Sequence, residues 1–423
     1  MPLMWLPVVL HGCLMFITRM SIATTISTHS TDGAPETAPC PSIECDCKYF
    51  GQPGDIAVQC SRIVRQIPVF EETNATFGSL YLARSNITSL TGKPFQVLRL
   101  RALDLTGNPL KGCPEDAFIG LESALEVISL ADCELNRIPS ALAHLAQLRT
   151  LHLDRNRISF VSKRIFQKNV QLVRVFLQRN SIKRIDRSSF DSLLFLEELK
   201  LSENQLNSIP RQLLSKLSRL TNLDLSSNFL HQIAPGTFQG LRKLEWLDLR
   251  SNIFHFVAPA MFRGLRSLEN LWLDKNPLLD IEGKTFAKLK KLKSLSLDVA
   301  RNTTMTGATF HRLRQLRTLS LGLMERETLP QGVFSSIKSL RHLSIIEHGG
   351  RFRGLSLDYF PSDMEFQLLR VWMEPIHQCR CNVAWIRHLT DRGTSVHGSC
   401  GSNQQQIQCS NRHLLPSTPE RTL

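Results

Sequence analysis

Several hallmarks of enzymes and membrane proteins are missing from this 423-residue sequence. It has no HExxH motif, no P-loop and no dinucleotide-binding fingerprint. No stretch after Cys60 is apolar and long enough to cross a membrane. We therefore expect a protein that is not an enzyme, needs no cofactor or metal, and has no membrane span.

Acidic side chains are few relative to basic ones. The chain has 37 Asp and Glu against 51 Lys and Arg, which gives a formal net charge of +14. Such an excess favours anionic partners, among them sulfated glycans, anionic membranes and nucleic acid.

Cysteine is nearly absent from the middle of the chain, where only Cys113 and Cys133 occur between Cys60 and Cys379. Even-numbered clusters at the two ends predict disulfide-bonded caps in an oxidising compartment. The clustered cysteines are Cys40, Cys45, Cys47 and Cys60 at one end, and Cys379, Cys381, Cys400 and Cys409 at the other. Zinc is the alternative, but the first cluster has no nearby histidine and an exported chain favours oxidation.

The first residues agree with export. The stretch MWLPVVLHGCLMFI is apolar and has the length of a signal-peptide core, and small residues follow it. We predict a signal peptide at residues 1–23; a membrane anchor or a misassigned start remains the alternative, because no Lys or Arg precedes the core. Residues 24–39 are rich in Ser, Thr and Pro and predict a flexible arm.

One phrase, LxxLxLxxNxL, recurs through most of the chain, for example as LRALDLTGNPL, LTNLDLSSNFL and LENLWLDKNPL. From Leu148 to Leu340 its spacing is 24 residues eight times in succession. The thirteen copies begin at Phe77, Leu100, Leu125, Leu148, Leu172, Leu196, Leu220, Leu244, Leu268, Leu292, Leu316, Leu340 and Leu368. A repeat of this kind indicates a solenoid, in which each unit buries its leucines against the next.

The phrase and the cysteine clusters resemble those of the extracellular leucine-rich-repeat protein family, over roughly residues 40–409. The resemblance implies an α/β repeat fold: a curved solenoid with a parallel β-sheet on its concave face and disulfide caps at both ends. It divides the chain into a cap at 40–76, repeats at 77–378, and a second cap with a tail at 379–423. The family pattern implies the disulfides Cys40–Cys47, Cys45–Cys60, Cys379–Cys400 and Cys381–Cys409. Cys400 and Cys409 are closer together than the pattern leads us to expect, which leaves the last pairings open.

Two further ladders follow the repeat. Phenylalanines recur 18 residues after the first leucine, with Leu214 replacing one, and we expect a buried aromatic spine. The Asn of the phrase should satisfy buried backbone groups where the chain leaves each strand. Ala300, Met324 and His348 occupy three later Asn positions, so we expect repeats 292–367 to stack less regularly, either as a specialised binding segment or through drift.

Cys113 and Cys133 fall at different points of neighbouring coils. We interpret them as buried free thiols, with a disulfide between them as the alternative. Three sequons predict N-glycosylation of an exported chain, at Asn74, Asn86 and Asn302.

The variable positions between the strand leucines should face the concave surface. Large or charged side chains at these positions on neighbouring repeats resemble a protein-binding hot spot, although the aromatic ones could instead only pack on their neighbours. The candidate residues are Phe176, Asp224, Trp246, Asp248, Arg250, Trp272 and Asp274. His152, Asp154 and Ser129 lie close enough in the pattern to resemble a catalytic triad, but no nucleophile elbow or closed pocket accompanies them.

A second candidate surface flanks the leucine that opens each later repeat. Stacking in register should align ten cations along one edge, which could bind heparan sulfate or another sulfated glycan, or could simply be solvated. We call this set the basic edge: Arg242, Lys243, Arg266, Lys290, Lys291, Lys293, Arg314, Arg317, Lys338 and Arg341. Nucleic acid is not expected, since an exported chain shows no nucleic-acid-binding motif.

These features predict a secreted recognition or adhesion protein that binds an extracellular protein ligand on its concave face. The family that the chain resembles includes matrix proteins, axon-guidance factors and immune receptors. The alternatives are an extracellular-matrix component that binds glycosaminoglycan through the basic edge, and a truncated receptor ectodomain.

Overall fold

The computed structural model describes residues 45–49, 56–60, 67, 77–348, 351–360, 370–376, 384–391, 394–400 and 405–409. All of them belong to one compact unit, Cys40–Leu423. The predicted signal peptide and flexible arm lie outside the described residues. No helix among the described residues is long and apolar enough to cross a membrane.

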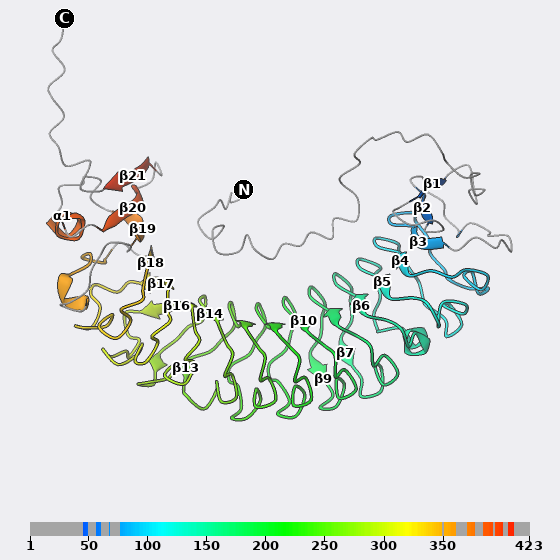
Figure 1. Cartoon of the computed structure of the whole chain (residues 1–423), viewed down its shortest axis with the longest axis horizontal. Coiled ribbons are helices and arrows are strands. Elements are labelled where there is room, and N and C mark those ends of the chain that lie inside the picture. Colours follow the sequence, from blue (N-terminus) through cyan, green and yellow to red (C-terminus); the bar gives the residue numbers. More distant parts are fainter. Residues whose placement is uncertain are drawn as a thin grey trace, which may run out of the picture. The chain divides into compact units, whose positions relative to one another are not determined.

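The unit is a solenoid whose coils each contribute one strand to a continuous parallel sheet (Figure 1). Neighbouring strands pair with equivalent residues opposite one another, as Leu199 opposes Leu223. The strands at the thirteen repeat positions are β3 Phe77–Tyr81, β4 Ala102–Asp104, β5 Val127–Ser129, β6 Thr150–His152, β8 Arg174–Phe176, β10 Glu198–Lys200, β11 Asn222–Asp224, β12 Trp246–Asp248, β14 Asn270–Leu273, β16 Ser294–Ala300, β17 Thr318–Met324, β18 His342–His348 and β19 Arg370–Ile376. The predicted parallel-sheet repeat fold is confirmed.

Helix contributes little to the described coils. They include two short 3-10 helices, η1 Ser140–His144 and η2 Leu357–Tyr359, and one α-helix, α1 Ala384–Thr390. Two-residue strands on the side away from the sheet pair as β7 Phe160–Val161 with β9 Arg184–Ile185, and as β13 Phe256–Val257 with β15 Asp280–Ile281. Most coils therefore return to the sheet through turns.

The predicted phenylalanine spine forms part of the core. Its members are at most 2% exposed, and neighbouring rings lie at stacking distance, with 6.0 Å between the centroids of Phe166 and Phe190. The spine consists of Phe166, Phe190, Phe238, Phe262, Phe286, Phe310 and Phe334, with Leu214 in the one vacant position. Rings of neighbouring coils also contact each other in the pairs Phe262–Phe286 and Phe310–Phe334, so packing between coils stabilises the solenoid.

The Asn ladder satisfies backbone groups as predicted. Asn204 is buried; its side-chain oxygen accepts from the N–H of Ile182 at 3.0 Å, and its amide donates to the carbonyls of Leu177 at 2.9 Å and Leu201 at 3.0 Å. Each such side chain thus joins two coils. The residue before it adopts a left-handed conformation, as Glu203 does with φ 53°, which ends the strand.

The expectation that repeats 292–367 stack less regularly is wrong for the strands that the structure describes there. β16 and β17 pair in register over seven residues, and so do β17 and β18, whereas most earlier strands are three residues long. At the point where earlier coils turn out of the sheet, these coils carry buried Val299, Leu323 and Glu347 in extended conformation. A β-branched side chain such as that of Val299 disfavours a positive φ, and in all three coils the strand continues through this position.

Backbone groups in this segment gain other partners. The Thr303 hydroxyl accepts from the N–H of Ala300 at 2.8 Å and donates to the carbonyl of Leu278 at 2.5 Å. The Arg326 guanidinium donates to the carbonyls of Ala300 and Thr303, at 3.1 and 2.9 Å. These side chains replace the missing asparagine.

Antiparallel strands close the sheet at both ends. β1 (Cys45–Tyr49) pairs with β2 (Ile56–Cys60), which continues in parallel into β3. β20 (Ser395–Cys400) runs parallel to β19 and pairs with β21 (Gln405–Cys409). Ile386 of α1 is fully buried.

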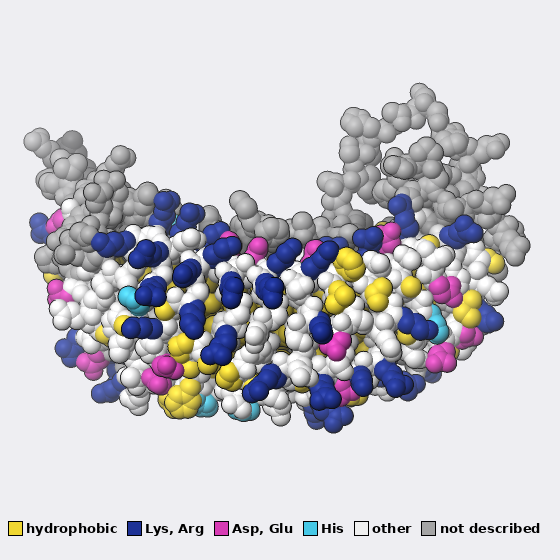
Figure 2. Space-filling view, turned by 60° about the horizontal axis from the view of Figure 1, so that its bottom comes forward, with side chains coloured by type: hydrophobic (Ala, Val, Ile, Leu, Met, Phe, Trp, Pro, Cys, Tyr) yellow, Lys and Arg dark blue, Asp and Glu magenta, His cyan; other side chains and the backbone are white. Residues whose placement is uncertain are grey.

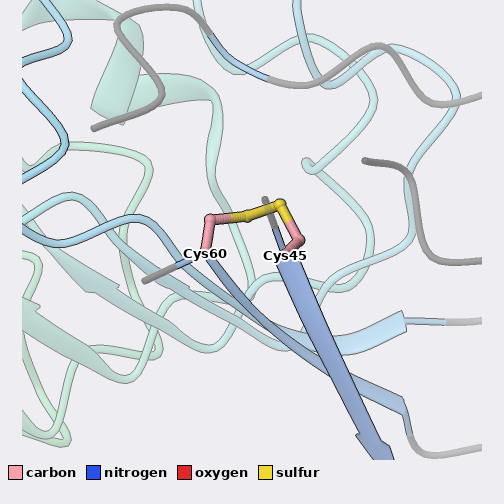
Figure 3. Close-up of a disulfide and its surroundings, with 2 residues drawn as sticks. All are labelled: Cys45 and Cys60. Atoms are coloured by element: carbon pink, nitrogen blue, oxygen red, sulfur yellow. A yellow bond between two sulfur atoms is a disulfide. The ribbon is translucent and has the colours of Figure 1, made fainter. Parts of the chain in front are cut away.

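One predicted disulfide is present. Cys45 and Cys60 face each other across β1 and β2 and are bonded (Figure 3). Cys40, Cys379 and Cys381 lie outside the described residues, and only the backbone of Cys47, Cys400 and Cys409 is described. The other three pairings therefore stay predictions.

Cys113 and Cys133 are both free thiols, but only Cys133 is buried, and Cys113 is half-buried. The Cys133 thiol occupies an Asn position and donates to the carbonyl of Leu105 at 3.1 Å. Burial raises the pKa of Cys113 to about 12 and that of Cys133 to about 11. Both are therefore protonated at neutral pH.

Candidate ligand-binding surfaces

The fifth position of each repeat forms one column of side chains across the exposed face of the sheet. Parallel pairing opposes each member to the next, so that Phe176 opposes Lys200 and Asp248 opposes Trp272. The column is Asp104, Ser129, His152, Phe176, Lys200, Asp224, Asp248, Trp272, Ser296, Ser320 and Ser344. Neighbours in such a column lie about 4.8 Å apart, so a ligand could contact several of them together.

Two tryptophans meet at the middle of this face. Trp246 of β12 and Trp272 of β14 have ring centroids 4.7 Å apart at an interplanar angle of 60°. The guanidinium carbon of Arg250 lies 5.9 Å from the Trp272 ring. Both tryptophans are half-buried, so each packs on a neighbour and still presents a surface to a ligand. We call Trp246, Asp248, Arg250 and Trp272 the tryptophan cluster.

Arg250 is bonded to Asp248 through two nitrogens. Its Nε lies 3.0 Å and its Nη2 2.6 Å from Oδ2 of Asp248, whose side chain is only 1% exposed. Burial raises the pKa of Asp248, although the hydrogen bonds and charge of Arg250 oppose this shift. Burial acts to lower the pKa of Arg250, but the bond and charge of Asp248, together with Asp274 and Asp224, raise it overall. The prediction that Asp248 faces a ligand therefore needs correction, because this carboxylate positions Arg250.

The two other predicted aspartates, Asp224 and Asp274, lie on the repeats before and after that of Asp248. Asp224 accepts from the hydroxyl of Ser226 at 2.7 Å. Oδ1 of Asp274 is buried and has no hydrogen-bond partner among the described residues. Burial, together with the charge of Asp274, raises the pKa of Asp298. The Asp298 carboxylate occupies the space that a side chain at position 322 would need, and the residue at that position is Gly322.

Phe176 lies apart from the tryptophan cluster. Its ring stacks on His152, with 4.4 Å between centroids, and the Lys200 ammonium lies 5.2 Å from its centre. Four strand spacings, about 19 Å, separate its position in the column from that of Trp272. The structure therefore divides the predicted concave site in two.

Of the triad-like residues, His152 and Asp154 lie near each other, with Nδ1 of His152 3.8 Å from Oδ1 of Asp154. The hydroxyl of Ser129 instead lies 2.7 Å from that of Thr106. Among the described residues no group of three or more His, Cys, Asp or Glu side chains could hold a metal ion.

The basic edge aligns as the repeat predicts. The N–H after each opening leucine donates to the carbonyl of the equivalent residue one coil earlier, as Arg317 does to Lys293 and Arg341 does to Arg317, each at 2.8 Å. Nine of the ten cations are exposed; Lys293 is half-buried and pairs with Glu269 at 2.6 Å. Figure 2 shows Lys and Arg side chains in rows over the C-terminal half of the solenoid.

The predicted sequons lie on the opposite side of the strands from the basic edge. Asn86 and Asn302 are exposed and follow the strand positions of their coils, whereas the basic edge precedes them. Asn74 lies outside the described residues. Glycans at Asn86 and Asn302 would leave the basic edge uncovered.

Sequence reasoning missed two features of these surfaces. It did not pair Asp248 with Arg250, although opposite charges two residues apart on one strand face were the available signal. It also overlooked exposed apolar side chains beside the basic edge, namely Val170, Leu194 and Phe195. The sequence could have revealed them, because they are apolar residues at repeat positions that carry cations in other coils.

The fold and its surfaces define a class of protein: a parallel β-solenoid with an open sheet face and a charged edge. The chain belongs to the leucine-rich-repeat family, since the family described as "Leucine rich repeat" matches residues 99–158, 170–230, 218–278 and 266–322, about half of the chain. A search of curated protein sequences found no match.

Three solved structures share the fold. A TLR13–ssRNA13 complex is 21% identical with a TM-score of 0.61, and the match covers 76% of this chain and 54% of that one. An LRR protein of Leptospira interrogans is 24% identical with a TM-score of 0.54, covering 67% of each chain. The Drosophila Toll–Spatzle complex is 18% identical with a TM-score of 0.56, covering 78% of this chain and 53% of that one. The chain thus spans about half the length of TLR13 and of Toll, and the likeness concerns the fold alone.

Proposed function

We propose that this protein is a secreted recognition protein that binds an extracellular protein ligand on the concave face of its solenoid. The observation that carries the proposal is the tryptophan cluster. Two half-buried tryptophans lie on an open sheet face, and Arg250 beside the Trp272 ring is bonded to the buried carboxylate of Asp248. Trp and Arg are the residues most enriched at the energetic centres of protein interfaces.

Two further observations support the proposal. The Cys45–Cys60 disulfide is typical of proteins in an oxidising compartment, which agrees with export. Two of the structures that share the fold are complexes, one of TLR13 with ssRNA13 and one of Toll with Spatzle. Solenoids of this kind offer extended surfaces to such partners.

The test begins with affinity capture from extracellular fluid, followed by calorimetry with the captured protein. Trp272→Ala should weaken its binding about 30-fold, the loss expected for a central aromatic anchor. It should lower the free energy of unfolding by only about 1 kcal/mol, since the residue loses one aromatic contact. Phe256→Ala is the matched control, because Phe256 is 62% exposed on β13, away from the sheet. An unchanged dissociation constant for Trp272→Ala would refute a concave ligand at this cluster.

The basic edge favours a second candidate function, attachment to an extracellular polyanion such as a sulfated glycan. Exposed cations repeated over five coils add their salt-dependent attractions. Elution from immobilised heparin should need salt well above the physiological concentration. Reversing the charges of Lys290, Lys291 and Lys293 should lower that concentration. Elution near physiological salt that these reversals leave unchanged would exclude this candidate.

A further inference from the structure

The basic edge continues into an apolar cluster that the two candidate functions do not use. Val170 is 42% exposed, Leu194 52% and Phe195 38%. Val170 and Leu194 stand two residues before the opening leucine of their repeats, and Phe195 stands one residue before it. Arg242, Arg266, Lys290 and later cations occupy the same two positions in the following coils. We call Val170, Leu194 and Phe195 the apolar cluster.

The two sets form one continuous row. In-register pairing from β8 to β18 carries equivalent positions straight along the edge. At seven strand spacings of about 4.8 Å, the row from Val170 to Lys338 extends about 34 Å. Figure 1 shows these coils side by side along the solenoid.

Acidic side chains are absent from the two positions that precede each opening leucine in this row. From Ser218 to Ser339, the two positions before each opening leucine hold only cations, Ser and Gln. The nearest carboxylates, Glu245 and Glu269, lie on the other side of the leucine, and Glu269 is paired with Lys293. The two positions before each opening leucine therefore present positive charge on successive coils, which favours an anionic partner.

The junction between the two sets joins a cation to an aromatic ring. The guanidinium carbon of Arg219 lies 4.4 Å from the centre of the Phe195 ring. Figure 2 shows a small group of apolar side chains beside the rows of cations, toward the N-terminal half. Charge and apolar surface thus lie on one face of the solenoid.

This combination discriminates between anionic partners. A sulfated glycan can neutralise the cations but offers no apolar phase to Val170, Leu194 or Phe195. An anionic lipid bilayer offers both, because its headgroups attract Lys and Arg and its acyl boundary accepts inserted side chains. A planar surface also suits a row about 34 Å long.

We propose that this edge binds an anionic lipid bilayer, with the cations at the headgroups and the apolar cluster inserted at the acyl boundary. The proposal rests on the basic edge as a polyanion-binding surface. It does not depend on a concave ligand. It names a lipid surface as the partner that the whole row fits.

The experiment measures cosedimentation of the full chain with phosphatidylcholine vesicles, with and without phosphatidylserine. The wild-type protein should bind only when phosphatidylserine is present. Arg266→Glu/Lys290→Glu/Arg314→Glu should weaken that binding at least about a hundredfold, since one cation at an anionic surface contributes about a factor of five. Lys163→Glu/Arg187→Glu/Arg211→Glu is the matched control: it reverses three exposed charges at one repeat position of three successive coils, off the edge. The control should bind as the wild type does.

The apolar arm separates a bilayer from a glycan. Val170→Ser/Leu194→Ser changes only exposed side chains, so the fold should be preserved. It should weaken vesicle binding about tenfold and leave heparin binding unchanged. Vesicle binding equal to wild type in this variant would overturn the proposal. Binding of the wild type to heparin but not to vesicles would also overturn it, while leaving the polyanion candidate intact.

Discussion

Removal of the Arg250 guanidinium tests how the tryptophan cluster is held. In Arg250→Ala, the Asp248 carboxylate, which is 1% exposed in the wild type, loses its bonds to Nε and Nη2. Breaking a buried ion pair from one side costs more than removing both partners, because the remaining charge is desolvated and unpaired. Water can reach the vacated space, since the Arg250 side chain is 36% exposed. We therefore expect a loss of about 2 to 3 kcal/mol in the free energy of unfolding at neutral pH.

The loss should depend on pH in a defined direction. Burial already holds the pKa of Asp248 above its ordinary value in the wild type, and removing Arg250 should raise it further. A carboxyl with a raised pKa in the folded state favours folding when protonated, and this contribution disappears as the pH rises through that pKa. The deficit of Arg250→Ala should therefore be largest near about pH 7 and shrink toward about pH 4.5.

Urea unfolding followed by circular dichroism at both pH values measures these effects. Arg179→Ala is the matched control, because Arg179 and Glu203 form an exposed pair at 2.9 Å; it should cost less than about 0.5 kcal/mol. Adding Asp248→Asn to Arg250→Ala should restore most of the stability, since no buried charge then remains. The reasoning fails if Arg250→Ala is no less stable than Arg179→Ala, or if the double variant is not rescued.

Two further predictions concern the asparagine ladder and the thiols. Asn204→Ala should lower the free energy of unfolding by about 3 kcal/mol, because buried backbone groups on two coils lose their hydrogen-bond partners. The control Gln205→Ala changes the exposed neighbouring residue and should cost less than about 0.5 kcal/mol. Equal urea midpoints for the two variants would contradict this prediction. Burial raises the pKa of Cys113 to about 12 and that of Cys133 to about 11. Both thiols should therefore resist alkylation at neutral pH in the folded protein and react after unfolding. Rapid labelling of the native state would show that their pKa values are lower.

The repeat determined much of this protein by itself. Leucines at a fixed spacing must be buried at equivalent positions in every coil. The spacing of the repeat therefore predicted the strand positions, the phenylalanine spine and the asparagine hydrogen bonds. The basic edge followed for the same reason, since in-register stacking turns equal repeat positions into rows. The Cys45–Cys60 bond came from family resemblance and is present.

Contacts within and between strands decided the rest. Replacing Asn by Ala300, Met324 and His348 suggested disorder in the stacking, yet buried side chains before these positions lengthen the strands instead. The repeat also could not show that the Asp248 carboxylate is bonded to Arg250, because that contact depends on the side-chain rotamers. Periodicity assigns side chains to a face, but only three-dimensional packing decides which of them remain available to a partner.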